Sequence, residues 1–68
     1  MHESLLKALE EAKQATEKLR KVFEEELEIA YIAGDAKKYG RYYKLDWDLL
    51  HVAVDLVIEI QNLKGGES

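Results

Sequence analysis

Residues 45–63 read LDWDLLHVAVDLVIEIQNL, and this stretch decides the fold of the chain. On a helical wheel its polar residues fall in one arc about 80° wide, and apolar residues take nearly all of the rest. The residues of the polar arc are Asp48, His51, Asp55, Glu59 and Asn62. A surface helix usually buries a stripe about 100° wide, so this helix needs neighbours on more than one side.

Polar residues recur at helical spacing through the whole second half of the chain. They step by three or four positions: Lys37, Arg41, Lys44, Asp48, His51, Asp55, Glu59 and Asn62. A strand would scatter these positions over both of its faces. The β-branched residues of 52–60 leave a pair of strands as the alternative, but the spacing favours one helix from about residue 36 to residue 64.

The first half of the chain is also helical, from about residue 3 to residue 33. Strong helix formers dominate it, and its charged residues occupy one side. The apolar residues that we expect on the packed side are Leu5, Ala8, Leu9, Ala12, Ala15, Leu19, Val22, Phe23, Ala30 and Ala33.

The two helices are separated by one short turn. Gly34 suits the left-handed residue that ends a helix, and Asp35 is a good N-cap for the next one. Gly65 and Gly66 supply the second stop, before a short tail at 65–68. The sequence therefore predicts a single all-α domain over 1–68, an antiparallel hairpin with its turn at 34–35.

Folding at that turn leaves part of the second helix uncovered. The expected register sets Leu19 beside Leu49 and Leu50, which uses only about half of the apolar arc. We expect another copy to cover the remainder, giving a homodimeric four-helix bundle, with a three-hairpin assembly as the second choice. The residues assigned to this interface are Asp46, Trp47, Leu50, Val54, Val57 and Ile58.

Composition limits the classes of partner. The net charge is −4 with a pI near 5.1, whereas a nucleic-acid binder normally carries a basic face. Acidic residues interrupt the apolar stretch, and the N-terminus lacks the pattern of a signal peptide. We expect a soluble protein, cytoplasmic or recombinant, that has no nucleic-acid partner, no membrane partner and no cofactor.

His51 is the first candidate for chemistry. It shares one helix face with Asp48 and Asp55, and a carboxylate beside an imidazole can orient a base or complete a metal site. The same three residues also fit a solvated surface stripe, which is the interpretation that we favour.

Glu26 and Asp46 interrupt the apolar faces of the two helices. Because a buried carboxylate is costly unless it is paired, we expect a polar network that sets the helix register. The alternative is a small ligand pocket at the turn end. Its lining would be Glu26, Tyr31, Tyr39, Tyr42, Tyr43 and Trp47.

Charge is ordered along the outer stripe of the second helix. Basic Lys37, Arg41 and Lys44 precede acidic Asp48, Asp55 and Glu59. This order opposes the helix dipole, which favours acids near the N-terminus. An antiparallel partner would set the basic half of one copy beside the acidic half of the other; a solvated face is equally compatible with the pattern.

The regular Lys/Glu/Ala/Leu pattern of 3–33, the Gly34-Asp35 turn and the absence of proline and cysteine resemble computationally designed helical bundles. This resemblance implies a scaffold whose second helix serves an interface or a pocket. The interior Gly40 and the aspartates of the second helix depart from that style.

Glu24, Glu25 and Glu28 resemble the Glu-Glu-x-x-Glu motif of MazG-type nucleoside triphosphate pyrophosphohydrolases, all-α dimers that bind Mg²⁺. Asp55 matches the aspartate of that family's later Glu-x-x-Asp motif, but Val52 stands where its glutamate belongs. The resemblance implies Glu25, Glu28 and Asp55 as metal ligands. We expect an assembly or binding function with no catalytic residue assigned, and this enzyme as the alternative.

Overall fold

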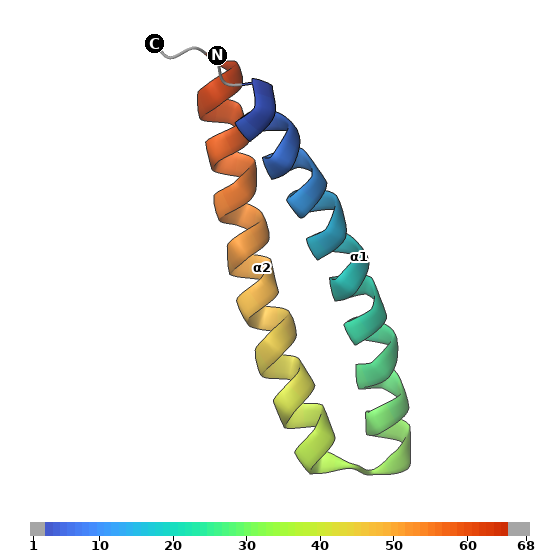
Figure 1. Cartoon of the computed structure of the whole chain (residues 1–68). Coiled ribbons are helices and arrows are strands. Elements are labelled where there is room, and N and C mark those ends of the chain that lie inside the picture. The colour runs from blue at the N-terminus through green and yellow to red at the C-terminus, as the bar shows by residue number, and fades with distance from the viewer. Residues whose placement is uncertain (1–2, 66–68) are drawn as a thin grey trace.

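The computed structural model describes residues 3–65, which form two long helices side by side. Helix α1 spans Glu3–Ala33 and helix α2 spans Ala36–Lys64, and they run antiparallel (Figure 1). This confirms the all-α helical hairpin. The molecule measures 50 × 15 × 12 Å, and its radius of gyration is 15.4 Å. A compact domain of this length would have a radius of gyration near 11 Å, so the hairpin is markedly elongated.

The turn has the hydrogen bonds that end a helix at glycine. Gly34 has φ +73°, its N–H donates to Tyr31 O at 3.1 Å, and the N–H of Asp35 donates to Ala30 O at 2.9 Å. These two hydrogen bonds together form a Schellman motif. Asp35 then caps α2, because its side chain accepts from Lys38 N at 3.1 Å. Both turn residues therefore act as the sequence predicted.

The far end of α2 is finished differently. The chain leaves the helix at Gly65, which has φ −73° and donates its N–H to Gln61 O at 2.8 Å. Gly65 thus extends the right-handed backbone rather than reversing it. Gly66, the second residue of the expected stop, lies outside the described residues.

The helices meet along a line of residues that we call the seam. Its members recur at three- and four-residue steps on both helices and are buried or half-buried. From α1 they are Leu6, Leu9, Lys13, Thr16, Arg20, Phe23, Leu27 and Ala30. From α2 they are Tyr39, Tyr42, Asp46, Leu49, Ala53, Leu56, Ile60 and Leu63.

The face that α1 turns toward α2 differs from the expected one. Leu5 is 50% exposed and Leu19 is 44% exposed, and Ala12 is exposed as well. The expected set spans two neighbouring rows, and of its members only Leu9, Phe23 and Ala30 lie in the seam. Most of the others belong to a row offset from the seam by one residue, which is about 100° around the helix.

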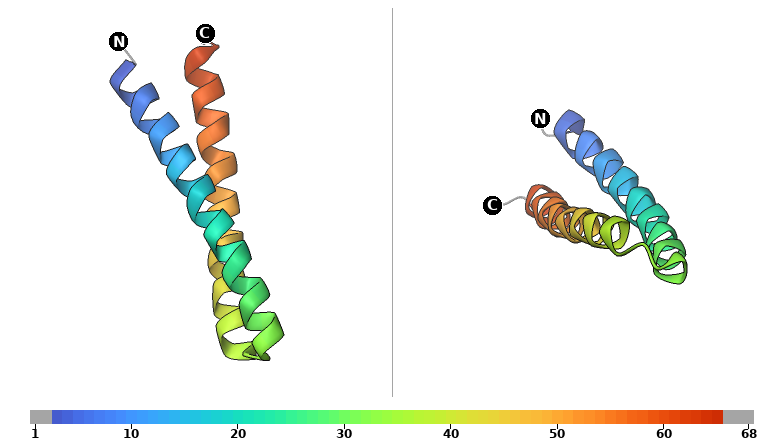
Figure 2. Two further views of the ribbon diagram at one scale, coloured as in Figure 1. Left: turned by 90° about the vertical axis from the view of Figure 1, so that its right-hand side faces the viewer. Right: turned by 90° about the horizontal axis from the view of Figure 1, so that it is seen from below.

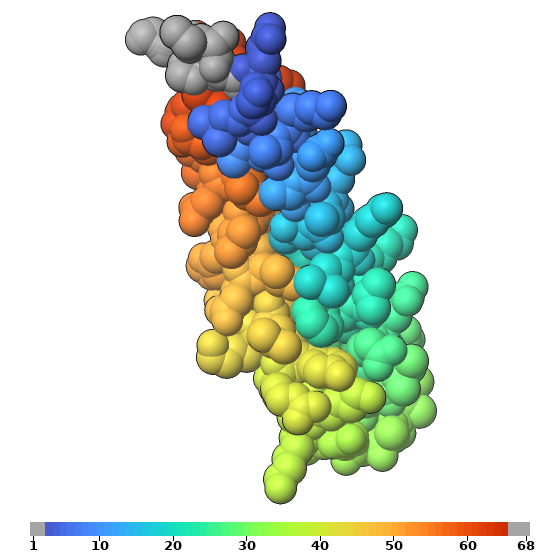
Figure 3. All heavy atoms as spheres, viewed as in Figure 1, coloured from blue at the N-terminus to red at the C-terminus, as the bar shows by residue number. Residues whose placement is uncertain are grey.

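The hairpin has very little interior. Its helices cross at an angle (Figure 2), and their side chains meet along the length of the molecule (Figure 3). Among residues 3–65 only Ala30, Ala53 and Ile60 are buried, and no side chain is below 2% exposed. One layer of contacts between two helices cannot enclose a core, because each helix keeps most of its circumference in water.

Candidate functional site

An apolar row on α2 remains uncovered by α1, and we call it the α2 stripe. It consists of Tyr43, Trp47, Leu50, Val54, Val57 and Ile58. Trp47 is 53% exposed, Val54 is 49% exposed and Ile58 is 50% exposed, whereas Leu50 and Val57 are half-buried at the edge of the seam. Five of the six residues assigned to the interface from the sequence belong to this stripe.

Asp46, the sixth residue assigned to that interface, lies in the seam instead. Its Oδ1 accepts a hydrogen bond from Arg20 Nε at 3.2 Å, and the two side chains are 16% and 27% exposed. A carboxylate that is partly shielded from water is thereby paired with a cation, as its burial requires. Sequence reasoning placed Arg20 on the polar side of its helix. Its spacing of seven residues from Leu27 is the signal that could have placed it in the seam.

A second apolar row, the α1 stripe, is exposed on α1. It consists of Leu5, Ala8, Ala12, Ala15, Leu19, Val22 and Ile29. Val22 is 50% exposed and Ile29 is 55% exposed. These residues include most of the row that the sequence assigned to packing against α2.

The two stripes lie on opposite sides of the hairpin. On one side, Lys64 Nζ pairs with Glu10 Oε2 at 3.0 Å, next to a hollow whose lining includes Gln14 and Val57. That side therefore combines the α2 stripe with a polar flank of α1. On the other side, Lys38 Nζ lies 3.5 Å from Glu26 Oε1. Glu26 continues the row of the α1 stripe, and Leu45 and Val52, which follow Lys38 at seven-residue steps on α2, are exposed on the same side.

Aromatic residues gather at the turn end, where the sequence suggested a ligand pocket. Tyr39 lies 6.3 Å from Tyr31 and 6.1 Å from Tyr43, measured between ring centroids. A hollow of about 460 Å³ lies beside them. Its lining residues are Ala30, Tyr31, Gly34, Asp35, Ala36, Tyr39 and Gly40. Tyr31 is 76% exposed, so this hollow is a shallow surface feature.

The other residues suggested for that pocket lie elsewhere. Tyr42 packs against Phe23 in the seam, with ring centroids 5.3 Å apart. Glu26 is paired with Lys38 on the opposite side, and Trp47 lies farther along α2. Of the six suggested residues, the structure places only Tyr31 and Tyr39 on the lining of the hollow.

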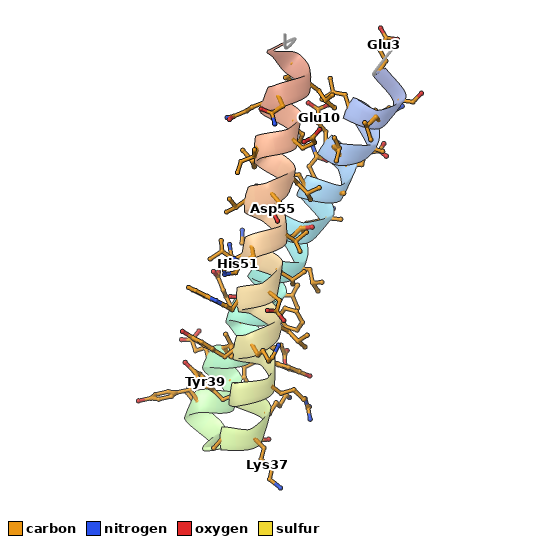
Figure 4. All side chains as sticks on the ribbon, turned by 90° about the vertical axis from the view of Figure 1, so that its left-hand side faces the viewer. Glu3, Glu10, Lys37, Tyr39, His51 and Asp55 are labelled. Atoms are coloured by element: carbon orange, nitrogen blue, oxygen red, sulfur yellow. The ribbon has the colours of Figure 1, made fainter. Side chains whose placement is uncertain are left out.

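His51 lies on the outer part of α2 together with Asp55 (Figure 4). Its ring meets the ring of Trp47 edge-on, with centroids 5.3 Å apart. The carboxylate of Asp48 is 3.1 Å from Lys44 Nζ and is therefore committed to a different neighbour. All three members of the proposed His51 cluster are exposed, without the shelter that general-base chemistry normally has.

The acidic residues that resemble a magnesium site are spread along the hairpin. Glu25 and Glu28 neighbour Glu26, which pairs with Lys38 near the start of α2. Asp55 lies in the second half of that helix. Over the described range 3–65, no three or more His, Asp or Glu side chains are grouped closely enough to hold a metal ion. Within one chain, Glu25, Glu28 and Asp55 therefore do not converge on one point.

Neither helix, as far as residues 3–65 show, is long and apolar enough to cross a membrane. No protein-family model matches the chain, and no curated protein or solved structure matches it. We therefore infer function from the surfaces described above, of which the α2 stripe is the most apolar and the richest in large side chains.

Proposed function

We propose that the chain is a structural module that associates with a second copy of itself, so that two hairpins form a homodimer of four helices. The α2 stripe is the interface, and its exposure in a hairpin that lacks a core is the observation that supports this proposal. The role of the protein is then assembly or binding rather than catalysis.

The surface of the single hairpin is larger than that of a compact monomer of the same mass. Its accessible surface is 5324 Å², about 900 Å² more than the roughly 4,400 Å² expected for a compact 7.9 kDa protein. A standard protein interface buries about 800 Å² on each partner. One interface of ordinary size would therefore reduce the accessible surface of the chain to about that of a compact protein of the same mass.

The composition of the α2 stripe also suits an interface. Aromatic and large aliphatic side chains are enriched in the buried centres of interfaces, where charged residues are depleted. Trp47 supplies the largest apolar side chain of the stripe, and tryptophan is a frequent energetic anchor. Asp48 and Glu59 are exposed, lie outside the stripe and would remain in water.

The experiment is a measurement of solution mass by light scattering coupled to gel filtration, over a wide range of concentrations. The expected mass is twice the chain mass of 7.9 kDa. A helical, well-folded monomer at all concentrations would overturn the proposal. A mass of three chains would replace the dimer by the three-hairpin assembly.

A matched pair of variants locates the interface. Val54→Glu and Val22→Glu make the same change at residues that are 49% and 50% exposed, one on each stripe. Val54→Glu should raise the dissociation constant at least about a hundredfold, because an unpaired carboxylate inside an interface costs several kcal/mol. Val22→Glu should leave the dimer intact. The opposite result would move the interface to the α1 stripe.

A further inference from the structure

We infer that the two α2 helices of the dimer run antiparallel about a two-fold axis beside Leu50, with Lys44 of each copy facing Asp55 of the other. This inference rests on the proposed self-association and adds the direction, the register and the ion pairs that select them.

The α2 stripe is self-complementary about its own midpoint. Tyr43 and Val57 each lie seven residues from Leu50. The midpoint between Trp47 and Val54 falls just after Leu50, so both pairs are centred on nearly the same point. An antiparallel partner centred there sets Tyr43 against Val57 and Trp47 against Val54. Each large aromatic ring then meets a smaller β-branched side chain, and Leu50 meets its own copy, so one two-fold operation covers these five residues of the stripe.

Charges along the outer edge of the stripe choose the antiparallel direction. The ring contact between His51 and Trp47 places the row of Lys44, His51 and Asp55 directly beside the stripe. Lys44 and Asp55 are equidistant from the peptide between Leu49 and Leu50, so the same axis brings them together. In a parallel pair the two-fold axis would place this edge of the two copies on opposite flanks of the interface, so Lys44 and Asp55 could not pair with each other.

Lys44 is suited to bridge the two copies. Its side chain is 78% exposed and, among residues 3–65, pairs with Asp48 alone, 3.1 Å away on the same helix. A carboxylate from the partner would give this ammonium group a second charged acceptor, across the interface.

The α1 stripe is the less suitable self-interface. Three of its seven residues are alanines, Ala8, Ala12 and Ala15, and it contains no aromatic side chain. It therefore offers smaller side chains to a second copy than the α2 stripe does.

The ion pairs can be tested with one charge-reversing substitution and a second one that compensates for it. Asp55→Lys places a lysine opposite Lys44 in the antiparallel dimer, and we expect about a tenfold higher dissociation constant from the two altered pairs. The exchange Lys44→Glu with Asp55→Lys should return the constant toward the wild-type value. A parallel dimer would respond to neither change in this way, since Lys44 and Asp55 of the two copies would lie on opposite flanks of the interface.

Direction and register can be read from disulfide crosslinking, because the chain has no cysteine of its own. In the full-length protein under mild oxidation, Leu50→Cys should form a covalent dimer by itself, since cysteines beside a two-fold axis come within bonding distance. Tyr43→Cys and Val57→Cys should crosslink only when the two variants are mixed. Val22→Cys is the control on the opposite side and should stay uncrosslinked.

The outcomes separate this inference from the proposed function. If Tyr43→Cys and Val57→Cys each crosslink alone, the helices are parallel and the inference is overturned, although the α2 interface stands. If the solution mass is that of a dimer but only Val22→Cys crosslinks, both the inference and the assigned interface are wrong. If the wild-type chain is a monomer, the proposed function itself fails.

Discussion

Arg20 Nε donates a hydrogen bond to Asp46 Oδ1 at 3.2 Å across the seam between α1 and α2. Both side chains interrupt rows that are otherwise largely apolar, and both are shielded from much of the solvent. A pair of this kind contributes more to choosing which faces meet than to net stability, because removing the two charges from water offsets much of their attraction.

Replacing one partner of this pair should therefore be worse than replacing both. Asp46→Leu leaves Arg20 without its acceptor in the seam, and we expect the free energy of unfolding to fall by about 1–2 kcal/mol. The double variant Arg20→Leu with Asp46→Leu should be at least as stable as the wild type. Urea unfolding at one fixed protein concentration measures both, and equal losses in the two variants would contradict the explanation.

Two glycines give substitutions of the same kind with opposite expected signs. A Cβ at Gly40 meets nothing within 4 Å, and the residue lies inside α2, so Gly40→Ala should stabilise the protein by about 1 kcal/mol. A Cβ at Gly34 also meets nothing, but its φ of +73° should make Gly34→Ala destabilising by about 1–2 kcal/mol. Thermal unfolding followed by circular dichroism compares them. A loss of stability in Gly40→Ala would show that another chain packs against this backbone in the assembly.

Trp47 is the one tryptophan of the chain and belongs to the α2 stripe, so its fluorescence reports on the interface. It is 53% exposed in the hairpin, and burial by a second copy should shift its emission to shorter wavelength. We expect the shift to be lost on dilution together with the dimer mass, and to be absent from Val54→Glu at concentrations where the wild type is dimeric. Emission that does not change while the mass halves would place Trp47 outside the interface.

Magnesium should have no specific effect on the protein. The acidic residues that resemble a pyrophosphohydrolase motif do not converge within one chain, and Mg²⁺ binding needs several oxygen ligands around one point. Thermal unfolding in MgCl₂ and in NaCl of matched ionic strength should therefore give the same midpoint. Stabilisation by MgCl₂ alone, abolished by Glu25→Gln, would instead support a metal site assembled between two copies.

The candidate interface could be predicted from the sequence in large part. Five of its residues follow from the width of the apolar arc of 45–63, which one neighbouring helix cannot cover. The place of Asp46 could not be predicted in this way. An acidic residue inside an apolar arc can face either neighbour, and only the position of Arg20 on the other helix shows which one it faces.

By itself the sequence determined the two helices, the turn at Gly34 and Asp35, and the surplus of apolar surface on the second helix, because spacing and turn chemistry are local properties. Only the tertiary structure decided which face of α1 lies in the seam. Two rows of equal spacing compete on that helix, offset by one residue, and one contains Phe23 while the other contains Leu19. Periodicity cannot distinguish rows that share a period. The choice depends on how Phe23 packs against Tyr42 and how Arg20 reaches Asp46, which are contacts between residues distant in sequence.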